Sequence, residues 1–196
     1  VATLFLASTA LQNPRLLPRK FTKHSPHERH NPMSTSSKPP AGIDPRGPRF
    51  GAGITAVLLL VTIALGLGVA ASGATLGDRA IQPAFLLLTA ITVVFAWGAF
   101  AGVARHPYGA LFKALIRPRL EAPAYLEEPE PPTFAQLVGF LVSITGVVLH
   151  LLGVPYGLVG AAAVAFIAAF LNSVFGLCLG CEMYAMLVRA KIIRSA

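Results

Sequence analysis

The chain has very few charged residues for its length. Charged side chains make up 12% of its 196 residues, whereas hydrophobic ones make up 55%. A soluble domain carries about 25% charged residues, so this composition argues against a soluble enzyme or a transcription factor. Cysteine is scarce as well, and two cysteines near the C-terminus are too few for a secreted scaffold held together by disulfides.

The usual sequence signatures of catalysis are also missing. The chain has no glycine-rich nucleotide loop, no Ser/His/Asp arrangement and no pair of carboxylates inside an apolar stretch. We therefore expect no cofactor. What the chain has instead is long apolar runs and a single Cys-x-x-Cys motif.

Four apolar segments of 21 residues each are long enough to cross a membrane: 51–71, 84–104, 134–154 and 157–177. His150 is the only ionisable residue in any of them. A hydrocarbon core of about 30 Å requires about 20 apolar residues, and within it every backbone N–H and C=O must be paired inside the segment. We therefore predict an all-α membrane protein whose four transmembrane helices form two hairpins.

The basic residues lie almost entirely on one side of these spans. Of the 16 Lys and Arg residues, 15 fall before the first span, between the second and third, or after the fourth. Arg79 is the exception, in the loop between the first and second spans. Loops rich in Lys and Arg stay in the cytoplasm, so we expect both termini and the middle loop to be cytoplasmic.

Residues 1–42 have no apolar periodicity and are typical of a disordered leader. Met33 opens a polar stretch, MSTSSKPP, of the kind that precedes a first membrane helix, so we expect translation to start there, with residues 1–32 not translated. The alternative is a secretory signal built on the apolar residues 4–11, which lacks a basic n-region and an A-x-A-like cleavage site. The transmembrane domain then covers residues 43–196.

The two halves of this domain share a motif. The pattern acid-Pro-x-x-Pro-x-Phe precedes the first span at residues 44–50 and the third span at residues 128–134. The prolines fix an extended approach and remove backbone donors just before a helix begins. Two hairpins that cross the membrane in the same sense form a parallel repeat, related by an axis along the membrane normal.

Two further segments, 108–117 and 182–194, have the spacing of short amphipathic helices. Each places apolar residues on one face and Lys or Arg on another, and basic helices of this kind lie in the headgroup plane of a membrane. We expect contact with the lipid bilayer and none with nucleic acid. Small residues such as Gly98 and Gly102 allow helices to approach closely, so the sequence is also compatible with a homo-oligomer.

Cys178 and Cys181 form the Cys-x-x-Cys motif at the cytoplasmic exit of the fourth span, and this spacing brings both sulfurs to one helical turn. Three interpretations are open: redox or sulfur chemistry, packing of small residues, and a metal site. The metal site is the weakest, because structural zinc needs four ligands and one chain supplies two thiols. A permanent structural disulfide is not expected in the reducing cytosol.

The charges and helix dipoles around these sulfurs have opposite effects on the stability of a thiolate. The C-terminal end of the fourth helix and the carboxylate of Glu182 both disfavour a thiolate, which is the reactive form. If Gly176 and Gly180 break the helix, however, the sulfurs face the N-terminus of the following segment, whose dipole favours a thiolate. The sequence leaves both arrangements open.

His106 is the candidate partner of the cysteines. It follows Arg105 at the cytoplasmic end of the second span, and aligning the two halves of the chain pairs it with Cys181. We expect His106, together with Arg105, to line a shallow catalytic site beside Cys178 and Cys181. The alternative is that a histidine before Pro107 simply ends a helix.

Asn172 and His150 are also polar residues within the spans. Asn172, a turn and a half before Cys178, is placed to orient the site by hydrogen bonding. His150 lies on the opposite side of the membrane, where we expect it to cap a helix or to pack near the outer interface. Ionisable residues inside a membrane are functional candidates by default, but we assign His150 no chemical role.

Several of these motifs together resemble a known family. The segments 44–50, 106–108, 117–120, 131–136 and 175–182 are similar to the bacterial membrane family called domain of unknown function 4395, from about residue 43 to residue 189. The block FGLCLGCE at 175–182 is the most specific of them. The resemblance implies a four-helix protein of the bacterial inner membrane. It also implies a gene that often lies beside genes for thioredoxin-like or rhodanese-like sulfurtransferase proteins.

We therefore expect a multi-pass membrane protein in which Cys178 and Cys181 exchange thiols and disulfides, or relay sulfur, with a soluble thioredoxin-like or sulfurtransferase protein. A non-catalytic membrane anchor for such a partner is the main alternative, and a small transporter of a sulfur compound is a third. An exchanger fails when either cysteine is replaced, an anchor tolerates both replacements, and a transporter shows substrate-dependent flux. Whether the protein is an enzyme stays open.

Overall fold

The computed structural model describes residues 42–68 and 75–193. The expected leader, the start at Met33 and the alternative signal at residues 4–11 lie outside these ranges, apart from Gly42. Within them the chain forms no strand, only one isolated bridge between Ile43 and Glu127. The helices are α1 (Arg46–Leu67), α2 (Leu76–Ala80), α3 (Pro83–Ala101), α4 (Pro107–Leu115), α5 (Glu130–Leu151), α6 (Gly157–Phe175) and α7 (Leu179–Arg189), with 3-10 turns at Val103–Arg105 and Arg117–Arg119.

The four long helices α1, α3, α5 and α6 correspond to the predicted spans. They have 22, 19, 22 and 19 residues and are long and apolar enough to cross a membrane. At 1.5 Å per residue they measure roughly 29–33 Å, which matches a hydrocarbon core. Helices α1 and α5 begin before the apolar stretches do, because prolines pre-organise their first turns: Pro45 is the N-cap of α1, and Pro131 is the second residue of α5.

Two glycines end helices earlier than apolar character alone predicts. Helix α3 ends at Ala101 because Gly102 adopts φ +83°, and α6 ends at Phe175 because Gly176 adopts φ +68°. Glycine reaches this left-handed region without the steric cost that a Cβ brings, which makes it a common helix stop. In both halves the chain therefore turns sharply before the short helix that follows.

The core of the bundle is apolar, and so is its outer surface. Leu59, Leu88 and Ala162 are completely buried in a cluster to which α1, α3, α5 and α6 contribute. Large apolar side chains on the outside of the same helices are exposed, among them Val57, Leu60, Leu86, Val93, Leu141 and Val174. A soluble protein rarely exposes such a surface, whereas lipid covers it in a membrane. The fold is therefore that of an all-α membrane protein.

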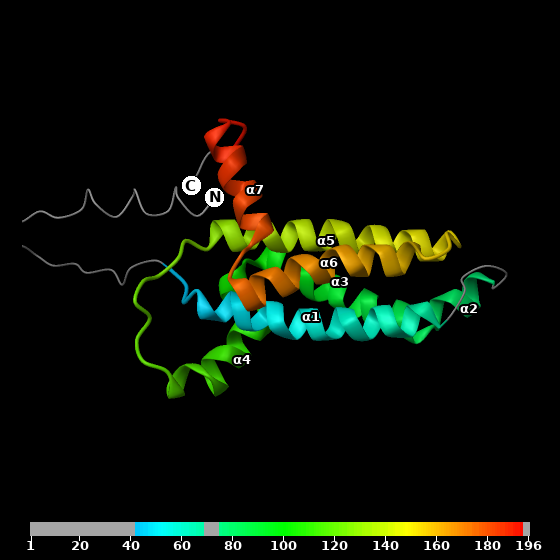
Figure 1. Cartoon of the computed structure of the whole chain (residues 1–196), viewed down its shortest axis with the longest axis horizontal. Helices are drawn as coiled ribbons and strands as arrows, with labels where there is room; N and C mark the ends of the chain where they lie inside the picture. Colours follow the sequence, from blue (N-terminus) through cyan, green and yellow to red (C-terminus); the bar gives the residue numbers. More distant parts are fainter. Residues whose placement is uncertain (1–41, 69–74, 194–196) are drawn as a thin grey trace, which may run out of the picture. The chain divides into compact units, whose positions relative to one another are not determined.

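The predicted parallel repeat is present, and it includes the short helices. Helices α1, α3 and α4 form the first half, and α5, α6 and α7 form the second (Figure 1). Helix α1 packs mainly on α6 and α3 mainly on α5, while α4 folds back onto α1 as α7 folds back onto α5. This pattern of contacts is the one expected when α1 corresponds to α5, α3 to α6 and α4 to α7.

The short helices dock through equivalent aromatic residues in the two halves. Phe50 meets Phe112 with the ring centroids 5.9 Å apart, and Phe134 meets Tyr184 at 5.8 Å. Phe50 and Phe134 close the repeated sequence motif, and Phe112 and Tyr184 are each the sixth residue of their helix. Both amphipathic segments thus pack on the same end of the bundle, which we call the α4/α7 end.

Close approaches between helices repeat in the same way. A Cβ atom at Gly51 would lie 3.4 Å from Tyr108, and a Cβ at Gly180 would lie 2.5 Å from Ala135. Gly51 and Ala135 directly follow the repeated phenylalanines, and Tyr108 and Gly180 are each the second residue of their helix. The glycine is on the long helix in the first half and on the short helix in the second.

The opposite end of the bundle obeys the same symmetry. Gly66 packs on Val159, and His150 stacks on Phe85 with centroids 5.4 Å apart. Gly66 and His150 are the penultimate residues of α1 and α5, and Val159 and Phe85 are the third residues of α6 and α3. The Nε2 atom of His150 also lies 3.3 Å from the carbonyl oxygen of Arg79. His150 is therefore a buried packing residue, in the role expected for it.

Candidate functional site

The connection between α6 and α7 places the two cysteines at a helix N-terminus. Gly176 ends α6, and its N–H donates to the carbonyl oxygen of Asn172 at 3.1 Å. Cys178 follows as the extended N-cap residue of α7. The helix break that the sequence left open is thus present at Gly176, whereas Gly180 lies inside α7.

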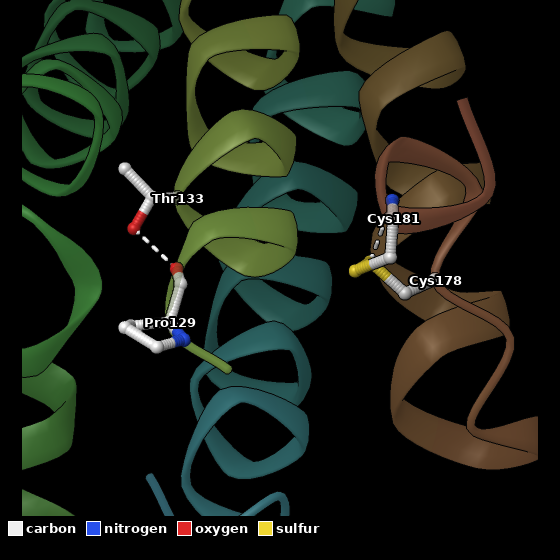
Figure 2. The surroundings of a disulfide bond; sticks show 4 residues. All are labelled: Pro129, Thr133, Cys178 and Cys181. Atoms are coloured by element: carbon white, nitrogen blue, oxygen red, sulfur yellow. Dashed lines mark hydrogen bonds between the residues drawn. A yellow bond between two sulfur atoms is a disulfide. The ribbon is translucent and has the colours of Figure 1, made fainter. Parts of the chain in front are cut away.

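Figure 2 shows the two sulfurs joined at the start of α7. Cys178 and Cys181 form a disulfide with their Cα atoms 5.2 Å apart, and the N–H of Cys181 donates to Sγ of Cys178 at 3.3 Å. The side chain of an N-cap residue lies beside the third residue of its helix, so this spacing brings the sulfurs together. The sequence argued against a permanent disulfide from the redox state of the cytosol, but the local geometry favours the bond.

The position of the pair favours a thiolate in its reduced form. A helix N-terminus carries a partial positive charge, and the N–H of Cys181 points at Sγ of Cys178. Glu182 follows directly and opposes this effect, but its side chain is exposed, so solvent and salt screen its charge. Of the two arrangements that the sequence left open, the structure has the one in which Sγ of Cys178 lies at the N-terminus of the following helix.

The disulfide borders a large cavity within the α4/α7 end. The cavity has a volume of about 1020 Å³, and α1, α3, α4, α5, α6 and α7 all contribute to its lining. Cys178 and Cys181 line it near the start of α7, and Ala165 lines it ten residues before the end of α6. Ten helical residues correspond to about 15 Å. The cavity therefore extends from the cysteines deep into the membrane-spanning part, and it is large enough for a small organic ligand.

The charged residues of the lining are nearly balanced in sign, with three positive and four negative. The positive residues are Arg49, Lys113 and Arg117, and the negative residues are Asp44, Glu127, Glu128 and Glu182. Asp44 is paired with Arg46 at 2.8 Å and with Arg117 at 3.3 Å. The hydrogen bond from Arg46 and the charges of both arginines hold the pKa of Asp44 below its usual value. The cavity therefore has no strong preference for an ion of either sign.

His106 lines the same cavity as the N-cap of α4. It is 5% exposed, and its Nδ1 accepts a hydrogen bond from the N–H of Tyr108 at 3.3 Å. Its Nε2 is buried and makes no well-formed hydrogen bond among the described residues, although the carbonyl oxygen of Val94 acts on the ring. Burial lowers the pKa of His106, and the carbonyl oxygen of Val94 offsets only part of this. The ring is therefore neutral near pH 7, and because Nδ1 accepts, its proton is on Nε2.

Gly98 makes room for His106. A Cβ atom there would lie 2.8 Å from Cδ2 of His106 and 2.9 Å from Oε1 of Gln136. Gln136 therefore lies beside His106, and it also lines the cavity. Sequence analysis missed Gln136 as a site residue. The signal that pointed to it was a polar amide in the first turns of an otherwise apolar span.

The structure identifies a different residue from the one expected as the equivalent of His106 in the second half of the repeat. His106 and Cys178 are the N-caps of α4 and α7, and each side chain accepts a hydrogen bond from a backbone N–H of its own helix. Cys178, and not Cys181, is therefore equivalent to His106, because the first half has an additional 3-10 turn before its short helix. Arg105 belongs to that turn, is exposed and does not line the cavity; its carbonyl accepts from the indole N–H of Trp97 at 3.2 Å.

Arg49 and Asn172 complete the surroundings of the disulfide, and both line the cavity. The guanidinium of Arg49 lies against Gly176, where a Cβ atom would be 2.8 Å from its Cζ. Asn172 was expected to orient the site through its side chain, but the hydrogen bond found is from the N–H of Gly176 to its backbone carbonyl. Sequence analysis counted Arg49 only as a basic residue, although its place directly before Phe50 put it at the α4/α7 end.

A metal site at the cysteines gains no further ligands from the described part of the chain. Within residues 42–68 and 75–193, no three His, Cys, Asp or Glu side chains come close enough together to hold a metal ion. The chemistry of the two sulfurs is then that of the disulfide and of the thiols that it yields on reduction.

Comparison with known proteins adds one finding about the chain as a whole. A family model described as "Domain of unknown function (DUF4395)" matches residues 43–189, from just before α1 to the end of α7. No curated protein and no solved structure matches the chain.

Proposed function

Since the chain belongs to the DUF4395 family, whose description assigns no activity, we propose its function from the site: Cys178 and Cys181 exchange thiols and disulfides with a soluble protein at the cytoplasmic face of the bacterial inner membrane. The observation that supports this most directly is the Cys178–Cys181 disulfide at the N-cap of α7. Both cysteines are partly exposed and border a cavity. A thioredoxin-like or sulfurtransferase protein, which presents a reactive cysteine of its own, is the class of partner that fits.

The exchange proceeds through a mixed disulfide. A thiolate of the partner attacks one sulfur of the pair, the bond between Cys178 and Cys181 breaks, and the departing sulfur takes the electron pair. A second thiolate of the partner then breaks the mixed disulfide. The partner ends with a disulfide and this protein with a dithiol, so two electrons and two protons have moved. In the reverse direction the stabilised thiolate of Cys178 attacks first and Cys181 resolves the mixed disulfide.

A sulfur relay would use the same nucleophile. The thiolate of Cys178 attacks the terminal sulfur of a persulfide on the partner, the S–S bond of that persulfide breaks, and the partner leaves as a thiolate. Cys178 then holds the persulfide. This variant needs only one cysteine in the transfer step, whereas thiol-disulfide exchange needs both.

The distribution of charge supports the cytoplasmic placement of this site. The α4/α7 end contains eight of the nine Lys and Arg residues in the described ranges, and Arg79 lies at the other end: Arg46, Arg49, Arg105, Lys113, Arg117, Arg119, Arg189 and Lys191. Positive loops remain in the cytoplasm. Both termini then lie on the cytoplasmic side, where soluble thiol proteins can reach the pair.

After reduction, we expect Cys178 and Cys181 to react with a membrane-impermeant maleimide from the cytoplasmic side only. The measurement compares labelling of the full-length protein in inside-out vesicles with labelling in right-side-out vesicles. Exposed Leu76 in α2 provides the control, because a Leu76→Cys variant without the native cysteines should label with the opposite preference. Labelling of the native pair from the outer side alone would contradict the orientation and remove a cytoplasmic partner.

A non-catalytic anchor for the same partner and a transporter of a sulfur compound are the alternatives. An anchor retains its function when both cysteines are replaced by serine. A transporter would use the cavity, and it would show substrate flux that is independent of the redox state of the pair. The exchange proposal requires the opposite result in both comparisons.

A further inference from the structure

We propose that the cavity binds a lipid-soluble quinone and that this quinone accepts two electrons from the reduced Cys178/Cys181 pair. The electron-transfer half of this inference rests on the proposed function, whereas the binding half does not. The chemistry of the ligand follows from three properties of the cavity: its apolar depth, its nearly balanced charges and one buried hydrogen-bond donor.

The depth of the cavity selects an apolar molecule. Phe95, Val142 and Val164 line it at positions within the transmembrane helices α3, α5 and α6. The charged residues of the lining, found outside this apolar part, are nearly balanced in sign, and the carboxylate of Asp44 is already paired with two arginines. A lining of this kind favours a neutral, lipid-soluble ligand over an anion or a cation.

The buried side chain of His106 indicates that the ligand carries a hydrogen-bond acceptor. The Nε2–H of His106 is buried, lies in the lining and makes no well-formed hydrogen bond among the described residues, where the carbonyl oxygen of Val94 offers only a weak contact. Buried donors are rarely left unpaired, because the loss of hydration is then uncompensated. A carbonyl oxygen on the ligand supplies a better acceptor than the carbonyl of Val94, and Gln136 beside His106 offers a second polar contact.

The disulfide beside the cavity indicates that the ligand accepts electrons from the reduced cysteines. A neutral, lipid-soluble molecule that has carbonyl oxygens and accepts two electrons is a quinone. When it oxidises the dithiol, Cys178 and Cys181 lose two electrons and two protons and form the S–S bond, and the quinone gains both to become a quinol. Because His106 and both cysteines line one cavity, a single ligand can meet the histidine and the pair. Oxidation would then pass from the membrane to a soluble protein.

Trp97 allows binding to be measured directly. It is the single tryptophan of the chain, and it precedes Gly98, which lies against His106 and Gln136. We expect decyl-benzoquinone to quench the emission of Trp97 saturably in the purified full-length protein. His106→Ser should weaken this binding about tenfold, which is the effect of losing one buried hydrogen-bond donor. Serine is a good N-cap, so the start of α4 is retained.

His150→Ser is the matched control, because His150 is equally buried but lies at the opposite end of the bundle. This variant should keep the wild-type quinone affinity, and thermal unfolding shows whether each variant is folded. Quenching that does not saturate, or an affinity that is unchanged in His106→Ser, would overturn the proposal.

A second measurement uses the wild-type protein alone. Methyl decanoate has a carbonyl group and a similar chain but accepts no electrons, and it should not displace the quinone at equal concentration. If it competes as well as the quinone itself, the cavity is a general site for lipid carbonyl groups, and the quinone assignment is wrong.

Quinone binding and disulfide exchange can be refuted independently of each other. Cys178→Ser should form no quinol, whereas the reduced wild type should form one quinol for each disulfide. Binding that depends on His106 without any exchange with a thiol protein would refute the proposed function alone. Exchange with a thiol protein without saturable quinone binding would refute this inference alone.

Discussion

Replacing Cys178 with serine is expected to abolish disulfide exchange with a thioredoxin-like protein, a loss on the order of a thousandfold or more in rate, as when a nucleophile is removed from an enzyme. Cys181→Ser should instead accumulate a mixed disulfide between Cys178 and the partner, because the resolving thiol is gone. The measurement follows the redox state of both proteins over time by the shift in mass on thiol alkylation. Met186→Ser, an exposed position on the same helix but outside the cavity lining, is the control that should leave the rate unchanged.

Two outcomes would contradict this account of the pair. If both serine variants exchanged disulfides at the wild-type rate, the cysteines would be packing residues and the anchor would be the better explanation. If the mixed disulfide accumulated in Cys178→Ser rather than in Cys181→Ser, Cys181 would be the attacking thiol, and the N-cap position would not select the nucleophile.

Gly180→Ala is expected to loosen α7 from α5 and to lower the free energy of unfolding by about 2–3 kcal/mol, the cost of overpacking at a close approach. The added Cβ would lie 2.5 Å from the Cα and Cβ atoms of Ala135, and a backbone atom cannot move aside as the end of a flexible side chain can. Exchange with the partner should slow as well, because the disulfide moves with α7. Thermal unfolding in detergent and the exchange rate measure the two effects.

The matched control for this substitution is Gly109→Ala in α4. A Cβ there would meet only the carbonyl oxygen of Val103 at 3.6 Å, an ordinary contact. Alanine is also a better helix residue than glycine by up to about 1 kcal/mol, so this variant should be as stable as the wild type or slightly more so. Adding Ala135→Gly to Gly180→Ala should recover part of the loss, since the two sites are in contact. Equal stabilities of Gly180→Ala and Gly109→Ala would contradict the docking of α7 on α5.

Composition and periodicity were sufficient to predict the helices. The apolar runs identified all four spans, because a membrane requires about 20 apolar residues in a helix and little else in the sequence satisfies that condition. The repeated motif that ends in Phe50 and Phe134 predicted two related halves, and the structure confirms this relation through the contacts of the same two rings. The bounds were less accurate, because prolines extend α5 at its start and Gly102 stops α3 early.

The candidate site was only partly predictable. The sequence named His106, Cys178 and Cys181, which all line the cavity, but it also grouped them with Arg105, which does not. It could not decide whether the chain breaks before the cysteines, because a glycine is compatible with both a continuous helix and a left-handed turn. The cavity itself is built from six helices and has no signature in any one segment of the chain.

The two halves use one structural element for two kinds of chemistry. Each half ends a long helix with a left-handed glycine and starts a short helix with a side chain that caps it. In the first half the cap is His106, a buried hydrogen-bond donor, and in the second it is Cys178, one sulfur of the disulfide. The repeat thus brings a polar anchor and a redox group to the same end of the bundle, around one cavity.

The central claim is that Cys178 is a stabilised thiolate in a reactive pair, and the rate of alkylation as a function of pH tests it most directly. The measurement uses the reduced full-length protein and quantifies the label on each cysteine by mass spectrometry. An ordinary cysteine reaches its half-maximal rate near pH 8.5. The account predicts a half-maximal rate for Cys178 at a clearly lower pH than this and lower than that of Cys181, with loss of labelling on oxidation. Half-maximal rates at or above pH 8.5 for both cysteines, with no response to oxidation, would contradict it.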